Sequence, residues 1–313
     1  MSVRGKVSIV GAYEHPGRDL PNHSAAQIHA EVALGALADA GLEIARRYGL
    51  RGHVRILVGN LASAAMDVGE WDRAVRELIT ARDESPDELA ANYLSWALLT
   101  YQSWRGEDVT AEVARLTAWA ATFDDPGARE APHGIRAEVA FAAGDFRVAA
   151  DEWLAFAASD SLNAPAATFT AGLAGLLALD ADRAAAGLAG NEATGRHGRL
   201  HSLDRRLLRG GLLGLAGRRA EALREGRLVL VEYERLGLRL RQAIGSLALI
   251  AVAGGDDPEV RELADGARAI LERLGAKPFL GLLDAAMASA SDPGRAPRPA
   301  PARLMRETSV TTT

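Results

Sequence analysis

The chain contains no cysteine among its 313 residues. Disulfide bonds, thiolate metal sites and cysteine nucleophiles are therefore excluded. Aromatic residues are also scarce, at 5%, whereas alanine, leucine and glycine abound, which favours closely packed helices over sheets. Because 48% of the residues are apolar, the chain can still bury a core, and global disorder is not expected.

Long apolar runs and a strong charge imbalance are missing too. The longest apolar run, Ala243–Gly254, has about 12 residues, against the roughly 20 that span a bilayer. The run Val7–Val10 is too short for the core of a signal peptide. A net charge of −5 gives no general attraction to nucleic acid or to an anionic membrane. We expect a soluble, cytoplasmic protein without membrane contact and without nucleic acid as its main partner.

The segment Val58–Pro86 has the pattern of one helix–turn–helix unit. Small and apolar residues recur at helical spacing on both sides of a turn at Gly69-Glu70-Trp71, and Pro86 ends the unit because it has no N–H to continue a helix. The residues in this pattern are Leu61, Ala62, Ala65, Ala74, Leu78 and Ala81. Together with Gly69, Trp71 and Pro86, their register resembles a tetratricopeptide repeat.

Turn-like positions recur along the chain at a period of about 37 residues. They are Gly69, Gly106, Gly144, Asp180 to Asp182, Gly217 and Gly254. Gly144 and Phe146 copy the first unit closely, whereas the copy at Gly217 is loose, and Gly226 stands where a large residue is expected. The pattern predicts an all-α fold for residues 42–290, a tetratricopeptide-like α-solenoid of about six helical hairpins with a concave face.

This helical part also resembles a larger family. Leu42–Gly52 with the following NLASAAMDVGEWDRA, and the later ARAILERLGAKPFLGLLDAAMA, are similar to the C-terminal repeats of bacterial nucleotide-cyclase and STAND-ATPase transcriptional regulators. The resemblance implies repeats that sense or bind partners, with the catalytic domains upstream. The chain has no GxxxxGK[ST] phosphate loop, and it has no helix-turn-helix with flanking basic residues.

Residues 1–41 have a different pattern. A short β-type run, Lys6–Ala12, and a loop precede a helix that Ser24 can cap and Gly41 can end. This strand, loop and helix resembles the start of lipid-transfer-type thiolases, which implies acyl-CoA chemistry. Thiolase chemistry needs a nucleophilic cysteine, and this chain has none. We therefore interpret residues 1–41 as a thiolase-like fragment.

Residues 291–313 are rich in proline and arginine, so we expect a disordered tail. Its prolines also allow a polyproline II conformation that a groove-binding partner can hold.

Two histidines and one basic segment are candidate sites. His197 and His201 have the four-residue spacing of a helical metal site, but Gly195 and Gly198 weaken a helix there, so an exposed loop is expected. Between Arg196 and Arg241 there are twelve arginines and five acidic residues, a formal charge of +7. This segment fits a surface for an acidic protein, for nucleic acid, or simply a solvated helix face. The candidate contacts there are Arg205, Arg206 and Arg209.

Three aromatic residues are the remaining candidates. Trp96, Tyr101 and Trp104 either line a binding groove, where aromatic side chains act as anchors, or fill the core. No catalytic motif and no cofactor site is recognisable in the sequence.

The sequence thus predicts a non-catalytic, regulatory or signalling scaffold that binds a protein or peptide on its concave face. One alternative is an acyl-CoA-binding or acyltransferase remnant without its catalytic cysteine, which calorimetry with acyl-CoA tests. Another is a recombined or truncated gene product without an activity of its own.

Overall fold

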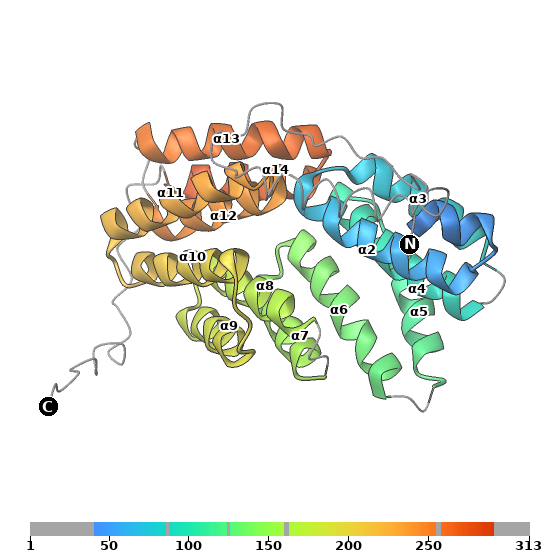
Figure 1. Ribbon diagram of the computed structural model, residues 1–313. Coiled ribbons are helices and arrows are strands. Elements are labelled where there is room, and N and C mark those ends of the chain that lie inside the picture. Colours follow the sequence, from blue (N-terminus) through green and yellow to red (C-terminus); the bar gives the residue numbers. More distant parts are fainter. Residues whose placement is uncertain (1–40, 86–87, 124–125, 160–162, 255–257, 291–313) are drawn as a thin grey trace, which may run out of the picture. The chain divides into compact units, whose positions relative to one another are not determined.

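The computed structural model describes residues 41–85, 88–123, 126–159, 163–254 and 258–290 (Figure 1). These residues form helices and turns and contain no strand, which confirms the predicted all-α class. The predicted strand Lys6–Ala12, the helix that follows it up to Ala40 and the tail from Ser291 lie outside the described residues. In the part that the structure describes, no helix combines the length and the apolar character needed to cross a bilayer.

From Arg51 to Ala290, the described helices follow one another in six pairs, with one more helix after the last pair. Residues 41–47 ahead of them are helical, which contradicts the predicted helix end at Gly41. The others are α2 (Arg51–Val68), α3 (Trp71–Asp83), α4 (Glu88–Arg105), α5 (Thr110–Ala120), α6 (Pro126–Ala143), α7 (Phe146–Ser159), α8 (Ala164–Leu177), α9 (Ala181–Ala193), α10 (Arg199–Leu215), α11 (Arg219–Arg235), α12 (Arg239–Ala253), α13 (Pro258–Leu274) and α14 (Lys277–Ala290). Each predicted turn lies between the two helices of one pair, from α2–α3 to α12–α13.

The turns show why glycine recurs at this period. Five turn glycines have positive φ angles, namely Gly69 (90°), Gly106 (83°), Gly144 (83°), Gly217 (79°) and Gly254 (61°). Left-handed backbone is open to glycine at little cost but strains other residues. In the fourth pair this position is taken by Leu179, with φ of 53°. There the following Asp180 caps α9, since its carboxylate accepts a hydrogen bond from the backbone N–H of Arg183 at 3.2 Å.

The chain divides into two compact units. The described residues of the first unit are 41–65, 70–85 and 88–98, and those of the second unit are 66–69, 99–123, 126–159, 163–254 and 258–290. In the first unit the predicted inward face of α3 is confirmed, because Trp71, Ala74 and Leu78 are buried. On α2, Ala62 and Ala65 are buried as well, as the register of Val58–Pro86 predicted.

In the second unit, α8 and α9 approach until their backbones touch. A methyl group added at Gly175 would lie 2.3 Å from the backbone nitrogen of Ala184. One added at Gly187 would lie 2.3 Å from the backbone nitrogen of Gly172. Both distances are far below van der Waals contact, so this helix pair depends on glycine at the contact.

Helices α8, α10 and α12 of the second unit also pack on one another. Between α8 and α10, Leu176 fills the space that a side chain at Gly211 would occupy. Gly226 of α11, where the repeat pattern predicts a large residue, faces Leu249 of α12, whose Cδ1 would lie 2.2 Å from an added Cβ. A large side chain from the next helix therefore replaces the one that Gly226 lacks.

Candidate partner-binding site

Two of the three predicted aromatic anchors are core residues. In α4, Tyr101 is 1% exposed and Trp104 is 6% exposed. The ring of Trp104 stacks on Phe141 of α6 with a centroid distance of 5.7 Å, and it lies 4.6 Å from Phe279 of α14. Because rings at this depth cannot reach a partner, Tyr101 and Trp104 fill the core and do not line a binding groove.

Trp96 differs, because it is only half-buried. In the first unit its ring lies 6.1 Å from that of the exposed Tyr93, which also belongs to α4. The guanidinium of Arg55 in α2 lies 5.1 Å from the centre of the Tyr93 ring, a cation–π distance. Aromatic residues beside an arginine are typical of binding hot spots, so Trp96 stays a candidate contact.

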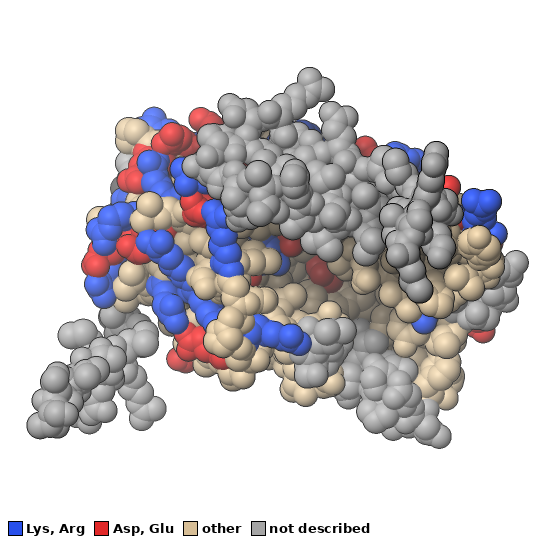
Figure 2. Space-filling model, viewed as in Figure 1, with Lys and Arg blue, Asp and Glu red and all other residues tan. Residues whose placement is uncertain are grey.

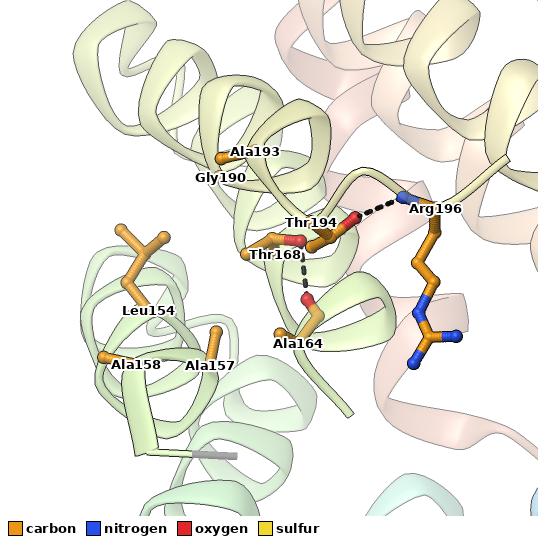
Figure 3. A pocket seen from close by; sticks show the side chains of 9 residues that line it. All are labelled: Leu154, Ala157, Ala158, Ala164, Thr168, Gly190, Ala193, Thr194 and Arg196. Atoms are coloured by element: carbon orange, nitrogen blue, oxygen red, sulfur yellow. Dashed lines mark hydrogen bonds between the residues drawn. The ribbon is translucent and has the colours of Figure 1, made fainter. Parts of the chain in front are cut away.

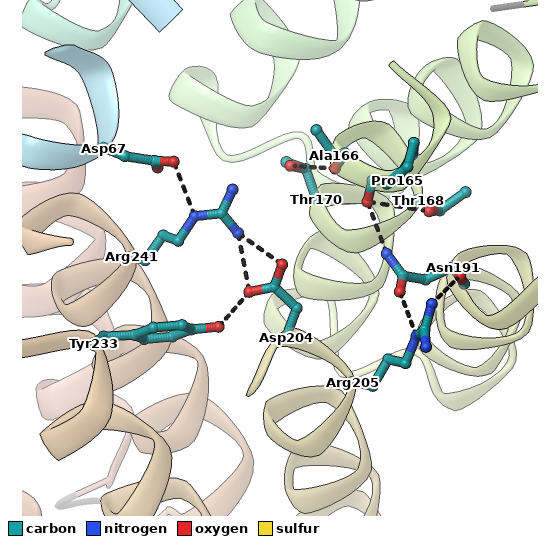
Figure 4. Close-up of polar contacts among 10 residues, drawn as sticks. All are labelled: Asp67, Pro165, Ala166, Thr168, Thr170, Asn191, Asp204, Arg205, Tyr233 and Arg241. Atoms are coloured by element: carbon teal, nitrogen blue, oxygen red, sulfur yellow. Dashed lines mark hydrogen bonds and ion pairs between the residues drawn. The ribbon is translucent and has the colours of Figure 1, made fainter. Parts of the chain in front are cut away.

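Arg205 has a structural role. Its Nε donates to Oδ1 of the buried Asn191 at 2.8 Å (Figure 4). Its Nη2 donates to the backbone oxygens of Asn191 at 2.9 Å and Arg196 at 2.8 Å. The Asn191 amide in turn donates to the backbone oxygen of Pro165 at 2.7 Å, so this chain of bonds joins α10 to α9 and α8. These internal bonds occupy the guanidinium that the sequence offered to a partner.

Arg206 and Arg209 lie on the surface and form ion pairs between helices. Arg206 donates through Nε and Nη2 to Glu225 of α11 at 2.9 and 2.8 Å, and Arg209 donates to Glu192 of α9 at 2.6 Å. Figure 2 shows the arginine side chains spread over the region of α10 and α11, with acidic side chains among them. Much of the arginine excess therefore pairs with acids of neighbouring helices, yet these guanidinium groups keep large exposed surfaces.

A buried charged cluster was not predicted. Arg241 of α12 donates from Nη1 to both carboxylate oxygens of Asp204 in α10, at 3.0 Å each, and from Nε to Asp67 at 3.0 Å (Figure 4). The Tyr233 hydroxyl of α11 donates to Asp204 at 2.6 Å. The guanidinium also lies 4.9 Å from the centre of the Phe169 ring of α8. Residues of α8, α10, α11 and α12 and of the end of α2 are thus joined in one cluster around the Arg241 guanidinium.

The electrostatics of this cluster indicate a structural role, which is to hold the helices together. Burial raises the pKa of Asp204, while the positive charge of Arg241 and the hydrogen bond from Tyr233 act against that rise. Burial also raises the pKa of the Tyr233 hydroxyl. Each charged group of the cluster is hydrogen-bonded to another member of it. One sequence signal was present: Asp204 shares the apolar face of α10 with Leu207 and Leu208, and a carboxylate there needs a buried partner.

A pocket of about 770 Å³ lies among α7, α8 and α9 in the second unit (Figure 3). Its walls are mainly small side chains such as Ala164. The hydroxyls of Thr168 and Thr194 donate to the backbone oxygens of Ala164 at 2.6 Å and Asn191 at 2.7 Å. Arg196 lies at the edge of the pocket. The lining of the pocket thus combines small apolar side chains with two threonines and Arg196, and it includes no aspartate, glutamate or histidine.

The histidine pair does not gather further ligands. Among the described residues, no three histidine or acidic side chains lie close enough together to hold a metal ion. No family model, no curated protein and no solved structure matches this chain. The resemblances to tetratricopeptide repeats, to STAND-type regulators and to thiolases therefore stay predictions.

One buried carboxyl group lies beside the aromatic cluster of α4 and α6. Glu138 of α6 has its Oε2 atom buried without a hydrogen-bond partner. Burial raises the pKa of Glu138 to about 8, and a hydrogen bond with the Trp104 side chain partly offsets that rise. The carboxyl is therefore protonated in the folded protein at neutral pH, while it ionises in the unfolded chain near its ordinary pKa of 4.5.

This difference predicts a pH-dependent stability. Because the folded state holds the proton up to about pH 8, the free energy of unfolding should fall as the pH rises from about 4.5 to 8. Glu138→Gln keeps a neutral side chain at every pH. It should match the wild type near pH 4.5 and exceed its free energy of unfolding by roughly 2–4 kcal/mol at pH 9.

Urea unfolding at a series of pH values measures the effect, and Glu84→Gln, at an exposed position, is the matched control. If the difference in the free energy of unfolding between the wild type and Glu138→Gln does not change with pH, the Glu138 carboxyl is not protonated in the folded protein as described.

Proposed function

We propose that this protein is a non-catalytic scaffold that binds a protein or peptide partner in a regulatory or signalling role. The observation that supports it best is the exposure of aliphatic and aromatic side chains on preformed helix faces, namely Tyr93, Val148, Leu228 and Val231. Such faces bind a partner without the cost of ordering a loop. The buried charged groups, in contrast, are engaged in bonds between helices.

The predicted concave face stays one candidate surface, because helices that pack side by side, as α8, α10 and α12 do, form such a face in an α-solenoid. Tyr101 and Trp104, which the sequence offered for such a groove, are buried. The exposed apolar side chains of α7 and α11 are the other candidate surface, and the solenoid form of the repeats is part of the same proposal.

The test is capture of the partner at defined positions. Lys6 and Lys277 are the lysines of the chain, so amine-reactive crosslinkers report on little of its surface. A photo-crosslinking amino acid is placed instead at Val148 or Leu228 in the full chain expressed in its native cells. One protein should be captured at a fixed molar ratio, and capture should be absent from Arg273 on the charged side of α13. A chain that is recovered alone from every position would contradict the proposal.

A further inference from the structure

Helix α11 carries an exposed stripe in which two apolar side chains lie between two arginines. At 100° per residue, Arg224, Leu228, Val231 and Arg235 fall within about 60° of one helix face. Leu228 is 49% exposed and Val231 45% exposed. The arginine side chains at the two ends of the stripe are also well exposed. We call these four residues the α11 stripe.

Two glutamates beside the α11 stripe are each held by two arginines, one from α10 and one from α11. Glu225 lies 2.8 Å from Arg206 and 3.7 Å from Arg224, and Glu232 lies 2.7 Å from Arg235 and is also bonded to Arg199. Each glutamate neutralises one of its two arginines, which leaves about one positive charge at each end of the stripe. The Arg199 hydrogen bond holds the pKa of Glu232 below its usual range, so this glutamate stays ionised at neutral pH.

The four arginines around Glu225 and Glu232 have further N–H groups that can donate hydrogen bonds to a partner. A guanidinium carries five N–H donors, and each of the four uses only part of them on its glutamate. Their side chains are 44–61% exposed. The arginines of each pair surround their glutamate, and Glu225 and Glu232 are seven residues apart in α11, so the centres of the two arginine pairs are separated by about 10 Å. That distance matches two turns of an α-helix, with the apolar side chains of the stripe between them.

We propose that the α11 stripe binds an acidic amphipathic helix of a partner protein. The partner helix carries two carboxylates about seven residues apart, one for each arginine pair, and apolar residues between them that cover Leu228 and Val231. Carboxylate to arginine bonds orient the helix, and the apolar contact contributes most of the affinity. This assignment rests on the proposed scaffold function and names the chemistry of the partner.

The test is selection of binders from a display library of helical peptides with randomised surface positions, using the full chain as target. Selected peptides should be enriched in aspartate or glutamate at positions seven apart, with leucine, isoleucine or phenylalanine three or four residues from them. Leu228→Ser, and the double substitution Arg224→Glu with Arg235→Glu, should each weaken binding about ten-fold or more. Raising the salt concentration should weaken it further.

Ile56→Ser on α2 and Arg273→Glu on α13 are matched controls, since they make the same kinds of chemical change at exposed positions that are not part of the proposed site. Circular dichroism confirms that each variant is folded. Peptides that bind all variants equally would overturn the α11 stripe as the site but leave the scaffold function standing. Recovery of no peptide, or of basic peptides only, would overturn both. If Leu228→Ser instead dissociates a dimer in sedimentation, a second copy of the chain covers the stripe and the acidic partner is ruled out.

Discussion

Replacing Gly187 by alanine should lower the free energy of unfolding by roughly 3 kcal/mol. The added methyl group would lie 2.3 Å from the backbone nitrogen of Gly172 and 2.8 Å from the backbone oxygen of Thr168. Backbone atoms cannot turn aside as a flexible side chain can, so α8 and α9 would have to move apart. That movement would loosen the buried Ala184 and Leu176 as well. Urea unfolding followed by circular dichroism measures the loss.

A second glycine separates this close approach from the intrinsic effect of alanine on helices. Gly266 lies in the exposed part of α13, and no atom within 4 Å would meet an added Cβ. Alanine is preferred over glycine inside helices by about 1 kcal/mol, so Gly266→Ala should stabilise the protein by up to that amount. The two substitutions are therefore expected to act with opposite sign. If Gly187→Ala also stabilises the protein, α8 and α9 do not touch as described.

Replacing Arg241 by methionine should destabilise the protein by about 3–5 kcal/mol. The substitution leaves Asp204 buried without its positive partner, and only the Tyr233 hydroxyl would still donate to it. Asp67 would lose the same guanidinium. Because a lone buried carboxylate is costly, a second substitution, Asp204→Asn, should recover part of the loss.

Arg239→Met is the control for this experiment. Arg239 lies two residues before Arg241 in α12, and its exposed guanidinium pairs with Glu234 at 3.4 Å. An exposed pair of this kind contributes less than about 1 kcal/mol, so Arg239→Met should have little effect on urea unfolding. If the two substitutions lower the free energy of unfolding equally, Arg241 does not hold α10, α11, α12 and the end of α2 together.

These features together favour a rigid second unit. The buried Arg241 cluster, the glycine contact of α8 with α9 and the packing of α8, α10 and α12 all resist relative movement of the helices in the second unit. A rigid surface is bound with little change of shape, so we expect the α11 stripe to have its binding geometry before the partner arrives.

The helical class and the positions of the six turns could be predicted from the amino-acid pattern. Both depend on local chemistry: glycine adopts the left-handed turn conformation, and apolar residues at a 3.6-residue period mark the buried helix face. The inward face of α3, with Trp71, Ala74 and Leu78, followed from that period. The exception is the fourth turn, where Leu179 takes the glycine position and only the capping residue Asp180 marked the place.

Which amphipathic residues are available to a partner depends on how the helices pack, and no local pattern predicts it. Tyr101 and Trp104 fit equally well in a groove or a core, and the packing of α6 and α14 on Trp104 buried it. Arg205 and Arg206 are adjacent in sequence, yet the Arg205 guanidinium is hydrogen-bonded to Asn191, whereas Arg206 lies on the surface. Arg241 meets Asp67 across 174 residues. Partners so distant are brought together by helix packing, which the local period of a sequence does not encode.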